Sequence, residues 1–232
     1  MQTLFIDSRD RTPQSPSAGN FTIELPNTLN LTSGQRWRVA DLRVPQAIPT
    51  IRAGINDTLT TAAIVGTITS TIPAGNYDGP GLAAVIQTTL RASSAFPWAV
   101  TYDSSLMTLT FSNTVSFQIV GGTFFNQLAA NGYDYTPTSW TFKNVSVLGC
   151  DVFYLCSPQF QNLDTYGPRG NHDVMMVANV TTGFGSVVTS SLDYETWRPC
   201  PSLSTQQLSF QLRDRDGNIL QVPSLSFCLV ID

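Results

Sequence analysis

Charged residues are scarce in this sequence. Asp, Glu, Lys and Arg make up 12% of its 232 residues, about half of the usual share near 25%. The apolar fraction of 42% is ordinary, so Ser, Thr, Asn and Gln stand where charges usually do. A protein that stays alone in solution keeps charge on its surface for colloidal stability. The deficit therefore indicates an exterior that other protein covers, and a neutral secreted domain is the alternative.

Basic clusters are missing as well. Lys143 is the only lysine, the arginines are scattered along the chain, and the net charge is −4. Phosphate binding needs a concentrated basic face, so we expect no direct, sequence-specific nucleic-acid partner. A lysine-rich patch of the kind that binds membrane surfaces is also absent, and the sequence leaves membrane contact open.

Long apolar runs do not occur. No stretch approaches the roughly 20 apolar residues of a membrane-spanning helix. Residues 1–7 lack the basic start and the apolar core of a signal peptide. We therefore expect a protein that is not secreted.

An active site is hard to assemble from this chain. His172 is the only histidine, it lies in a loop between Asn171 and Asp173, and no G-x-S-x-G motif accompanies it. A Ser-His-Asp or Cys-His site would have to use this residue. We expect an exposed turn histidine and no enzyme.

Metal and cofactor sites lack their usual patterns. Residues 214–218 begin like a calcium loop, but the acidic residue that should close the loop at its twelfth position is Leu225, so a hairpin turn is favoured. We expect free thiols in a reducing compartment, with two disulfides as the alternative. The four cysteines match no metal-ligand spacing; they are Cys150, Cys156, Cys200 and Cys228.

The last stretch of the chain predicts two strands. Leu208, Phe210 and Leu212 alternate with polar residues, as in a half-buried strand. Residues 214–218 can reverse the chain, because Gly and Asn tolerate the left-handed backbone conformation. Alternation resumes at Leu225, and a final strand needs a neighbour to pair its amides and carbonyls. We expect that neighbour near the N terminus, which would close one sandwich.

The N-terminal part predicts further strands. Residues 4–7 are typical of a short edge strand, and residues 8–19 of a polar loop. Residues 21–25 alternate as a strand that Pro26 ends, because proline cannot donate to the ladder. Residues 35–44 form a longer strand whose apolar phase changes. A bulge near Ala40 would explain this, since one extra residue flips the inward face; a strand buried on both sides is the alternative.

The middle of the chain combines helix and strand signals. Residues 64–72 are a Thr-rich strand candidate, and a helix begins after them with Asp78 as cap and Pro80 in its first turn. Strands are expected at 98–102, 106–111 and 115–120, and a short helix at 124–131. The helix face that should be buried consists of Leu82, Val85, Ile86 and Leu90.

Strands return in the last part of the chain, at residues 141–148, 151–157, 173–180 and 185–189. About eight sandwich strands with long connections fit a jelly roll better than a propeller, because no internal repeat is present. The sequence thus predicts a mainly β protein, a single jelly-roll (Greek-key) β-sandwich of residues 1–55 and 136–232. Residues 56–135 would form a small α/β insertion.

Four groups of residues stand in an order that resembles a known protein family. They are Ile6-Asp7-Ser8; residues 20–26 followed by Trp37-Arg38-Val39-Ala40; residues 72–77 ahead of the Leu82 helix; and a closing hairpin from Leu208 to Leu229 around Asp216-Gly217. This order is similar to the penton (vertex) and minor capsid proteins of icosahedral DNA viruses whose major capsid protein is a double jelly roll. Adenoviruses, virophages, Polinton-like elements and giant viruses form that lineage.

The resemblance implies a structural virion protein. Similar proteins form homopentamers at the vertices of the icosahedral capsid, contact the major capsid protein and catalyse nothing, so we expect no cofactor. The chain would be assembled in the host cell and reside in the virion. Its candidate partner contacts are Arg9, Arg11, Arg36, Arg38 and Arg169.

Other expectations concern the N-terminal segment and two rival functions. The segment up to about Gly19 is expected to reach toward neighbours or the virion interior. A carbohydrate-binding β-sandwich module or a receptor-binding domain is the alternative function, and its exposed aromatic row would consist of Trp98, Tyr102, Tyr133 and Tyr135. No Arg-Gly-Asp triplet is present, so the resemblance brings no receptor role with it.

Overall fold

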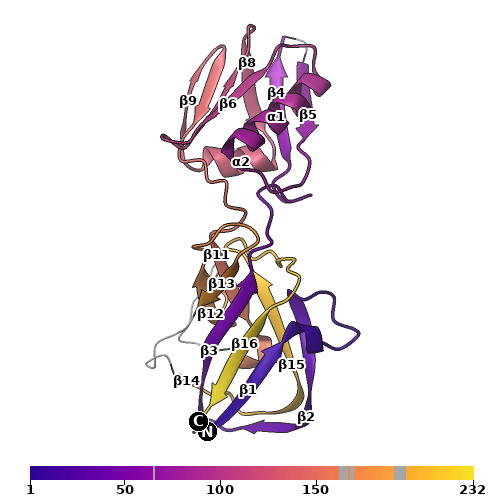
Figure 1. Ribbon diagram of the computed structural model, residues 1–232, viewed down its shortest axis with the longest axis vertical. Helices are drawn as coiled ribbons and strands as arrows, with labels where there is room; N and C mark the ends of the chain where they lie inside the picture. The colour runs from indigo at the N-terminus through magenta and orange to yellow at the C-terminus, as the bar shows by residue number, and fades with distance from the viewer. Residues whose placement is uncertain (65, 162–166, 168–169, 191–196) are drawn as a thin grey trace. The chain divides into compact units, whose positions relative to one another are not determined.

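The computed structural model describes residues 1–64, 66–161, 167, 170–190 and 197–232 (Figure 1). The chain divides into two compact units, and the second is inserted into the first. Unit 1 consists of Met1–Ile48 and Cys150–Asp232, and unit 2 of Pro49–Gly149.

Unit 1 is built from two antiparallel sheets. The first has the order β1 (Gln2–Asp7), β16 (Ser226–Ile231), β3 (Arg36–Pro45) and β13 (Val187–Ser190), with the short β14 (Arg198–Pro199) also pairing β3. The second has the order β12 (Val174–Asn179), β11 (Val152–Cys156), β15 (Leu203–Arg213) and β2 (Asn20–Leu31).

The strand order identifies the architecture. With β14 set aside, the first, eighth, third and sixth strands along the chain form one sheet, and the fifth, fourth, seventh and second form the other. Consecutive strands repeatedly change sheets, which is the double Greek key of a jelly roll. The expected mainly β, single jelly-roll fold is confirmed, and the insertion carries both α-helices found in the described residues.

A bulge in β3 decides which residues of this strand enter the core. Leu229 pairs with Val39 and Cys228 with Asp41, so Ala40 is an extra residue without a partner on β16. Trp37 and Val39 are buried before the bulge, and Leu42 and Val44 are buried after it. The bulge predicted near Ala40 is confirmed, because the extra residue moves the inward face by one position.

The two ends of the chain lie side by side. β16 pairs with β1 on one side and with β3 on the other, and Gln2 is opposite Ile231; Figure 1 shows both termini at the same place. The expected pairing of the last strand near the N terminus is confirmed.

The expected closing hairpin is wrong in one respect. Residues 214–218 do turn the chain, with Gly217 at φ +79° and an isolated bridge between Arg213 and Ile219. However, β15 and β16 then enter different sheets. The apolar side of β15 therefore packs against the apolar side of β16 across the sandwich. The rings of Phe210 and Phe227 meet there edge to face, with centroids 4.9 Å apart.

Pro26 does not end the second strand, contrary to expectation. β2 continues to Leu31. Its register against β15 jumps from Glu24 opposite Gln207 to Leu29 opposite Thr205, so Pro26 lies in an irregular stretch where its missing N–H breaks no ladder bond. β2 is also an edge strand, where proline is tolerated.

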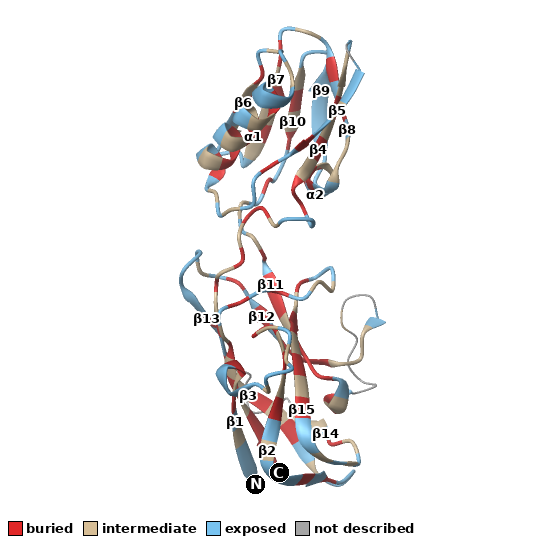
Figure 2. Cartoon of the chain, turned by 90° about the vertical axis from the view of Figure 1, so that its right-hand side faces the viewer, coloured by how far each residue is buried: buried red, intermediate tan, exposed pale blue. Residues whose placement is uncertain are grey.

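Unit 2 combines two further antiparallel sheets with two helices. The elements are β4 (Thr58–Ala63), β5 (Gly66–Thr71), α1 (Gly79–Ser93), β6 (Ala99–Asp103), β7 (Thr108–Ser112), β8 (Phe117–Gly121), α2 (Thr123–Ala129), β9 (Tyr133–Thr136) and β10 (Ser139–Phe142). One sheet has the order β6-β7-β10-β9 and the other β5-β4-β8. Stretches of buried and exposed residues follow each other along the strands of both units (Figure 2).

Three details of unit 2 differ from the sequence-based expectations. The single strand expected at 64–72 is part of a pair, in which β4 runs antiparallel to β5. The sandwich strand expected at 141–148 does not form: only residues 141–142 are in a strand, β10, which pairs with β7 and β9 inside the insertion. Unit 2 therefore extends beyond 56–135 on both sides, because Ile51 also bonds to Gly75 within it.

Helix α1 follows the sequence closely. The Asp78 carboxylate accepts the Gly81 N–H at 2.8 Å, and Pro80 lies in the first turn. Leu82, Ile86 and Leu90 are buried, which confirms the expected apolar face. Neither helix in the described ranges has the length and apolar character that crossing a bilayer requires.

Candidate functional site

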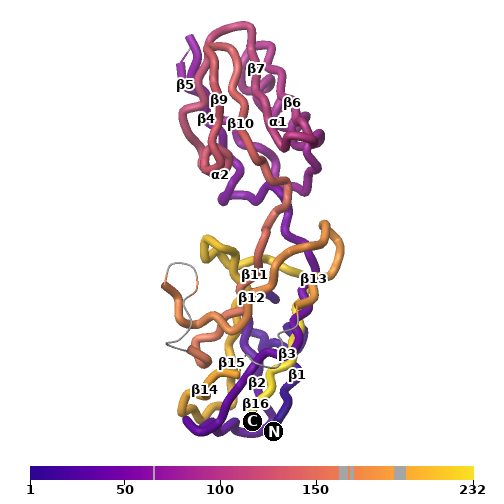
Figure 3. Tube along the Cα trace, turned by 90° about the vertical axis from the view of Figure 1, so that its left-hand side faces the viewer, coloured from indigo at the N-terminus to yellow at the C-terminus, as the bar shows by residue number. Residues whose placement is uncertain are grey.

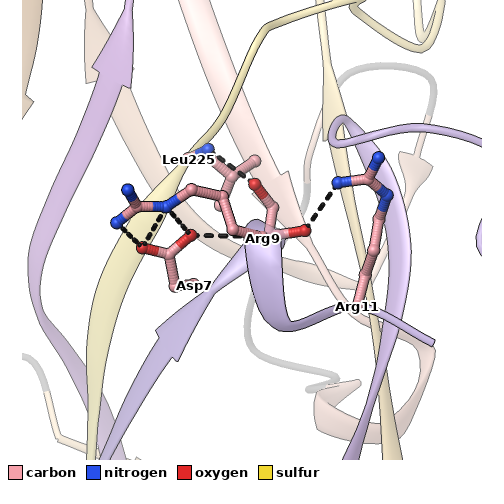
Figure 4. A network of polar contacts seen from close by, with 5 residues as sticks. Asp7, Arg9, Arg11 and Leu225 are labelled. Atoms are coloured by element: carbon pink, nitrogen blue, oxygen red, sulfur yellow. Dashed lines mark hydrogen bonds and ion pairs between the residues drawn. The ribbon is translucent and has the colours of Figure 1, made fainter.

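The first two candidate arginines belong to a single turn of 3-10 helix, Ser8–Asp10, that follows β1: Arg9 lies within the turn and Arg11 directly after it (Figure 4). Arg9 donates from Nε to both carboxylate oxygens of Asp7, at 3.0 and 3.1 Å, and its Nη2 adds an ion pair. These bonds lower the pKa of Asp7, chiefly through the side-chain hydrogen bond from Arg9. Arg11 donates to the Ser8 carbonyl at 3.0 Å.

The rest of the N-terminal segment is tied to the sandwich. Thr12 N–H donates to the Thr22 carbonyl at 2.8 Å, and the Ser15 hydroxyl accepts the Thr22 N–H at 2.9 Å. Ser17 and Asn20 form a bridge that leads into β2. In this structure the segment folds back on its own unit, so any contact with neighbours would be made by its exposed side chains.

Arg36 and Arg38 lie at the opposite end of the same sheet, on β3. The Arg36 backbone exchanges hydrogen bonds of 3.1 and 2.8 Å with Asp232, and the Arg38 guanidinium lies 5.0 Å from the centre of the Trp197 ring. Asp7, the partner of Arg9, pairs across the sheet with Ser226, which pairs with Arg43. Arg38 pairs with Val230, four residues further along β16. The structure therefore does not gather these arginines into one basic patch, and Arg169 lies outside the described residues.

In the part of the chain that the structure describes, the ionisable groups around His172 do not form a catalytic arrangement. Its neighbour Asp173 forms an ion pair of 3.0 Å with Arg213, and both side chains are mostly buried. His172 itself is half-buried, whereas the sequence predicted an exposed turn histidine. Burial and the nearby Asp173 raise the pKa of the Cys156 thiol to about 12. A thiol held in its protonated form is a poor nucleophile.

The cysteines and the expected turn at residues 214–218 lie within the described ranges. None of the four cysteines, all of which lie in the described part of the chain, forms a disulfide, and burial raises the pKa of the Cys200 thiol to about 11. No group of three or more His, Cys, Asp or Glu residues in the described part could hold a metal ion. Asp214 accepts the Asn218 backbone N–H at 2.8 Å and its side-chain amide at 3.0 Å, so residues 214–218 form the expected turn, although the strands before and after it enter different sheets.

Exposed apolar residues on the two flanks of the jelly roll were missed by the sequence analysis. Phe5 is 80% exposed on the edge strand β1, and Met1 precedes it at 85%. On the opposite edge, Val187 of β13 and Phe184 in the preceding loop are each 52% exposed, and Val177 of β12 is 44% exposed. A signal was available for Phe5, since Leu4 and Ile6 turn inward and an alternating edge strand leaves Phe5 outside.

The aromatic row expected for carbohydrate binding does not form. Trp98 is buried and meets Phe117 edge to face. The Tyr102 hydroxyl donates to the Val145 carbonyl at 3.3 Å. Tyr133 and Tyr135 remain exposed, and both stack on Trp140.

The comparisons with known proteins concern this architecture. No protein-family model matches the chain, and no curated protein matches it in sequence. Among solved structures, the crystal structure of the selenomethionine-labelled mavirus penton protein matches with a TM-score of 0.52, covering 100% of this chain and 99% of that one. The chain has the fold of the mavirus penton protein.

The likeness to the mavirus penton protein is one of fold, because the two sequences are only 8% identical. It covers both units, since practically the full length of each chain is included. The resemblance to penton proteins noted from the sequence is confirmed at this level.

Proposed function

We propose that this chain is a structural subunit of an icosahedral capsid, a penton or minor capsid protein that forms a homopentamer at the vertices. In the virion it would contact the surrounding major capsid protein, with no catalysis and no cofactor. The observation that carries the proposal is the full-length likeness in fold to the mavirus penton protein.

The two flanks of unit 1 support the ring. Five copies around an axis need a heterologous interface, in which one flank of each subunit meets a different flank of the next. β1 and β13 are opposite edges of one sheet, and both carry exposed apolar side chains, Phe5 on one and Val187 on the other. Apolar side chains at the centre of an interface contribute most of its stability.

The low surface charge agrees with extensive protein contacts. The candidate arginines would then act at the rim, where Arg9 and Arg36 are exposed. Rim charges mainly steer association and register. This assigns Arg9, Arg11, Arg36, Arg38 and Arg169 to contacts with neighbouring copies or with the major capsid protein.

The first test is the mass of the purified chain by mass photometry. A homopentamer has five times the chain mass of 25.3 kDa. Phe5→Asp and Val187→Asp should each abolish the ring, because each places a charge in an apolar contact. Leu106→Asp is the matched control, since Leu106 is 67% exposed and belongs to unit 2, whereas the assigned flanks belong to unit 1.

Mixing the two flank variants tests the ring geometry. Each variant keeps one intact flank, so a mixture should form dimers of one Phe5→Asp chain with one Val187→Asp chain and nothing larger. The proposal would be overturned if the wild-type chain stayed monomeric and also failed to bind a co-expressed major capsid protein. Rings that survive both substitutions would refute the assigned flanks.

A further inference from the structure

Unit 2 has an open groove between its two sheets. β8 and β9 are each the last strand of their sheet, and a hollow of about 580 Å³ lies where β8 begins and β9 ends. This volume lies within the range of binding sites in proteins. Ile64, Phe117, Tyr135 and Pro137 line the hollow with two alanines of β4.

The backbones on both sides of the groove begin to pair and then stop. Phe117 N–H donates to the Pro137 carbonyl at 2.9 Å, which joins the start of β8 to the end of β9. Backbone N–H and C=O groups alternate in direction along a strand. Ile119 is two residues from Phe117 and Tyr135 is two residues from Pro137, so the backbone groups of Ile119 and Tyr135 face the same gap. In the described residues these two strand edges form no ladder with each other. Unpaired edges of this kind accept an added strand.

Most side chains that line the groove are apolar, and one of them, Tyr135, presents an exposed aromatic ring. Ile64 is 81% exposed and Tyr135 is 65% exposed. The Tyr135 ring stacks on Trp140 at 5.2 Å, which supports it from one side and leaves its outer side open. The polar lining consists of Ser116 and Gln118, and no charged residue takes part.

We propose that this groove binds an extended, uncharged segment of a partner protein. The segment adds a strand beside the open edges of β8 and β9 and places an apolar side chain between Ile64 and Tyr135. Main-chain hydrogen bonds supply affinity in such strand addition, and pockets for alternate side chains supply specificity. A glycan fits less well, because its hydroxyl groups need more polar partners than Ser116 and Gln118 provide. The proposal holds whether or not the chain forms a ring.

The probe is a phage-displayed library of random peptides, panned against the full-length chain. Enriched peptides should alternate apolar and polar residues without charge. They should bind Ile64→Asp at least about tenfold more weakly than wild type, because the substitution places a charge in the groove. Leu106→Asp, at another exposed apolar position (67% against 81% for Ile64) on the β6–β7 turn, should bind them as wild type does.

Hydrogen exchange separates strand addition from simple apolar adhesion. The bound peptide should slow exchange at the amides of Ile119 and Tyr135, and proline at the centre of the peptide should weaken binding about tenfold or more. The proposal is overturned if panning enriches no peptide that distinguishes Ile64→Asp from Leu106→Asp, or if those amides stay unprotected. It is also overturned if a glycan array binds the chain and Tyr135→Ala abolishes that signal, or if Ile64→Asp alone lowers the assembled mass of the chain.

Discussion

Ser8 and Leu225, 217 positions apart in the chain, exchange two hydrogen bonds. Ser8 N–H donates to the Leu225 carbonyl at 2.9 Å, and Leu225 N–H donates to the Ser8 hydroxyl at 2.9 Å. Ser8 is fully buried. The pair continues the β1–β16 ladder by one step beyond Asp7 and Ser226. It thereby locks the N-terminal strand, with its exposed Phe5, onto the C-terminal strand.

Ser8→Ala should destabilise unit 1 by about 1–3 kcal/mol, because the Leu225 N–H would stay buried without an acceptor. Urea denaturation followed by unit-specific probes measures the loss, since two units can unfold in separate transitions. Ser33→Ala, at an exposed position between β2 and β3, is the control and should change stability by less than about 0.5 kcal/mol. Equal effects of both substitutions would contradict the role given to Ser8.

The bulge at Ala40 makes adjacent residues of β3 unequal. Leu42→Ala should cost about 2–5 kcal/mol, because Leu42 is fully buried in the core. Asp41→Ala should cost at most about 1 kcal/mol, since it removes an exposed ion pair of 2.9 Å with Arg43. A strand without the bulge would continue the phase of Trp37 and Val39 and bury residue 41, so the opposite ranking in denaturation would argue against the bulge.

The Asp7–Arg9 pair should make unit 1 weaker in acid. Hydrogen bonds from Arg9 hold the pKa of Asp7 below its ordinary 3.8, so the unfolded chain takes up this proton first as the pH falls. The stabilisation is therefore present above about pH 4 and is lost as the pH drops through the lower folded-state value. The effect is small, because Arg9 is largely exposed and solvent screens the pair. Asp7→Asn should remove this component when stability is compared across that window, while Asp134→Asn should not.

Cys156 should give the opposite dependence in alkali. Its pKa rises from 9.0 to about 12, first because of burial and then because of Asp173. The folded protein keeps the thiol protonated where the unfolded chain ionises, so stability falls as the pH rises from about 9 toward 12. Iodoacetamide labelling read by mass spectrometry at mildly alkaline pH should modify Cys228, which is partly exposed, before Cys156. Rapid native labelling of Cys156 would show that its burial is overstated.

Many elements of the fold could be predicted from patterns of neighbouring residues in the sequence. The phase change around Ala40, the Asp78 cap of α1 and the Gly217 turn each depend on a few adjacent positions, and all three were found. The candidate site was less readable. Arg9 follows β1 and Arg36 begins β3, at opposite ends of one sheet. The exposure of Val187 and the open edges of β8 and β9 involve strands that are distant in sequence.

The sequence by itself determined where the chain extends, coils and turns, because hydrophobic alternation, capping and glycine conformation act over a few residues. Only the tertiary structure decided which strands became partners. It sent β15 and β16 to different sheets, carried β2 past Pro26 and drew β10 into the insertion. These outcomes depend on burying the apolar faces of both sheets of each unit at once. A local sequence pattern predicts that one face of a strand is apolar, but it does not predict which other strand will cover that face.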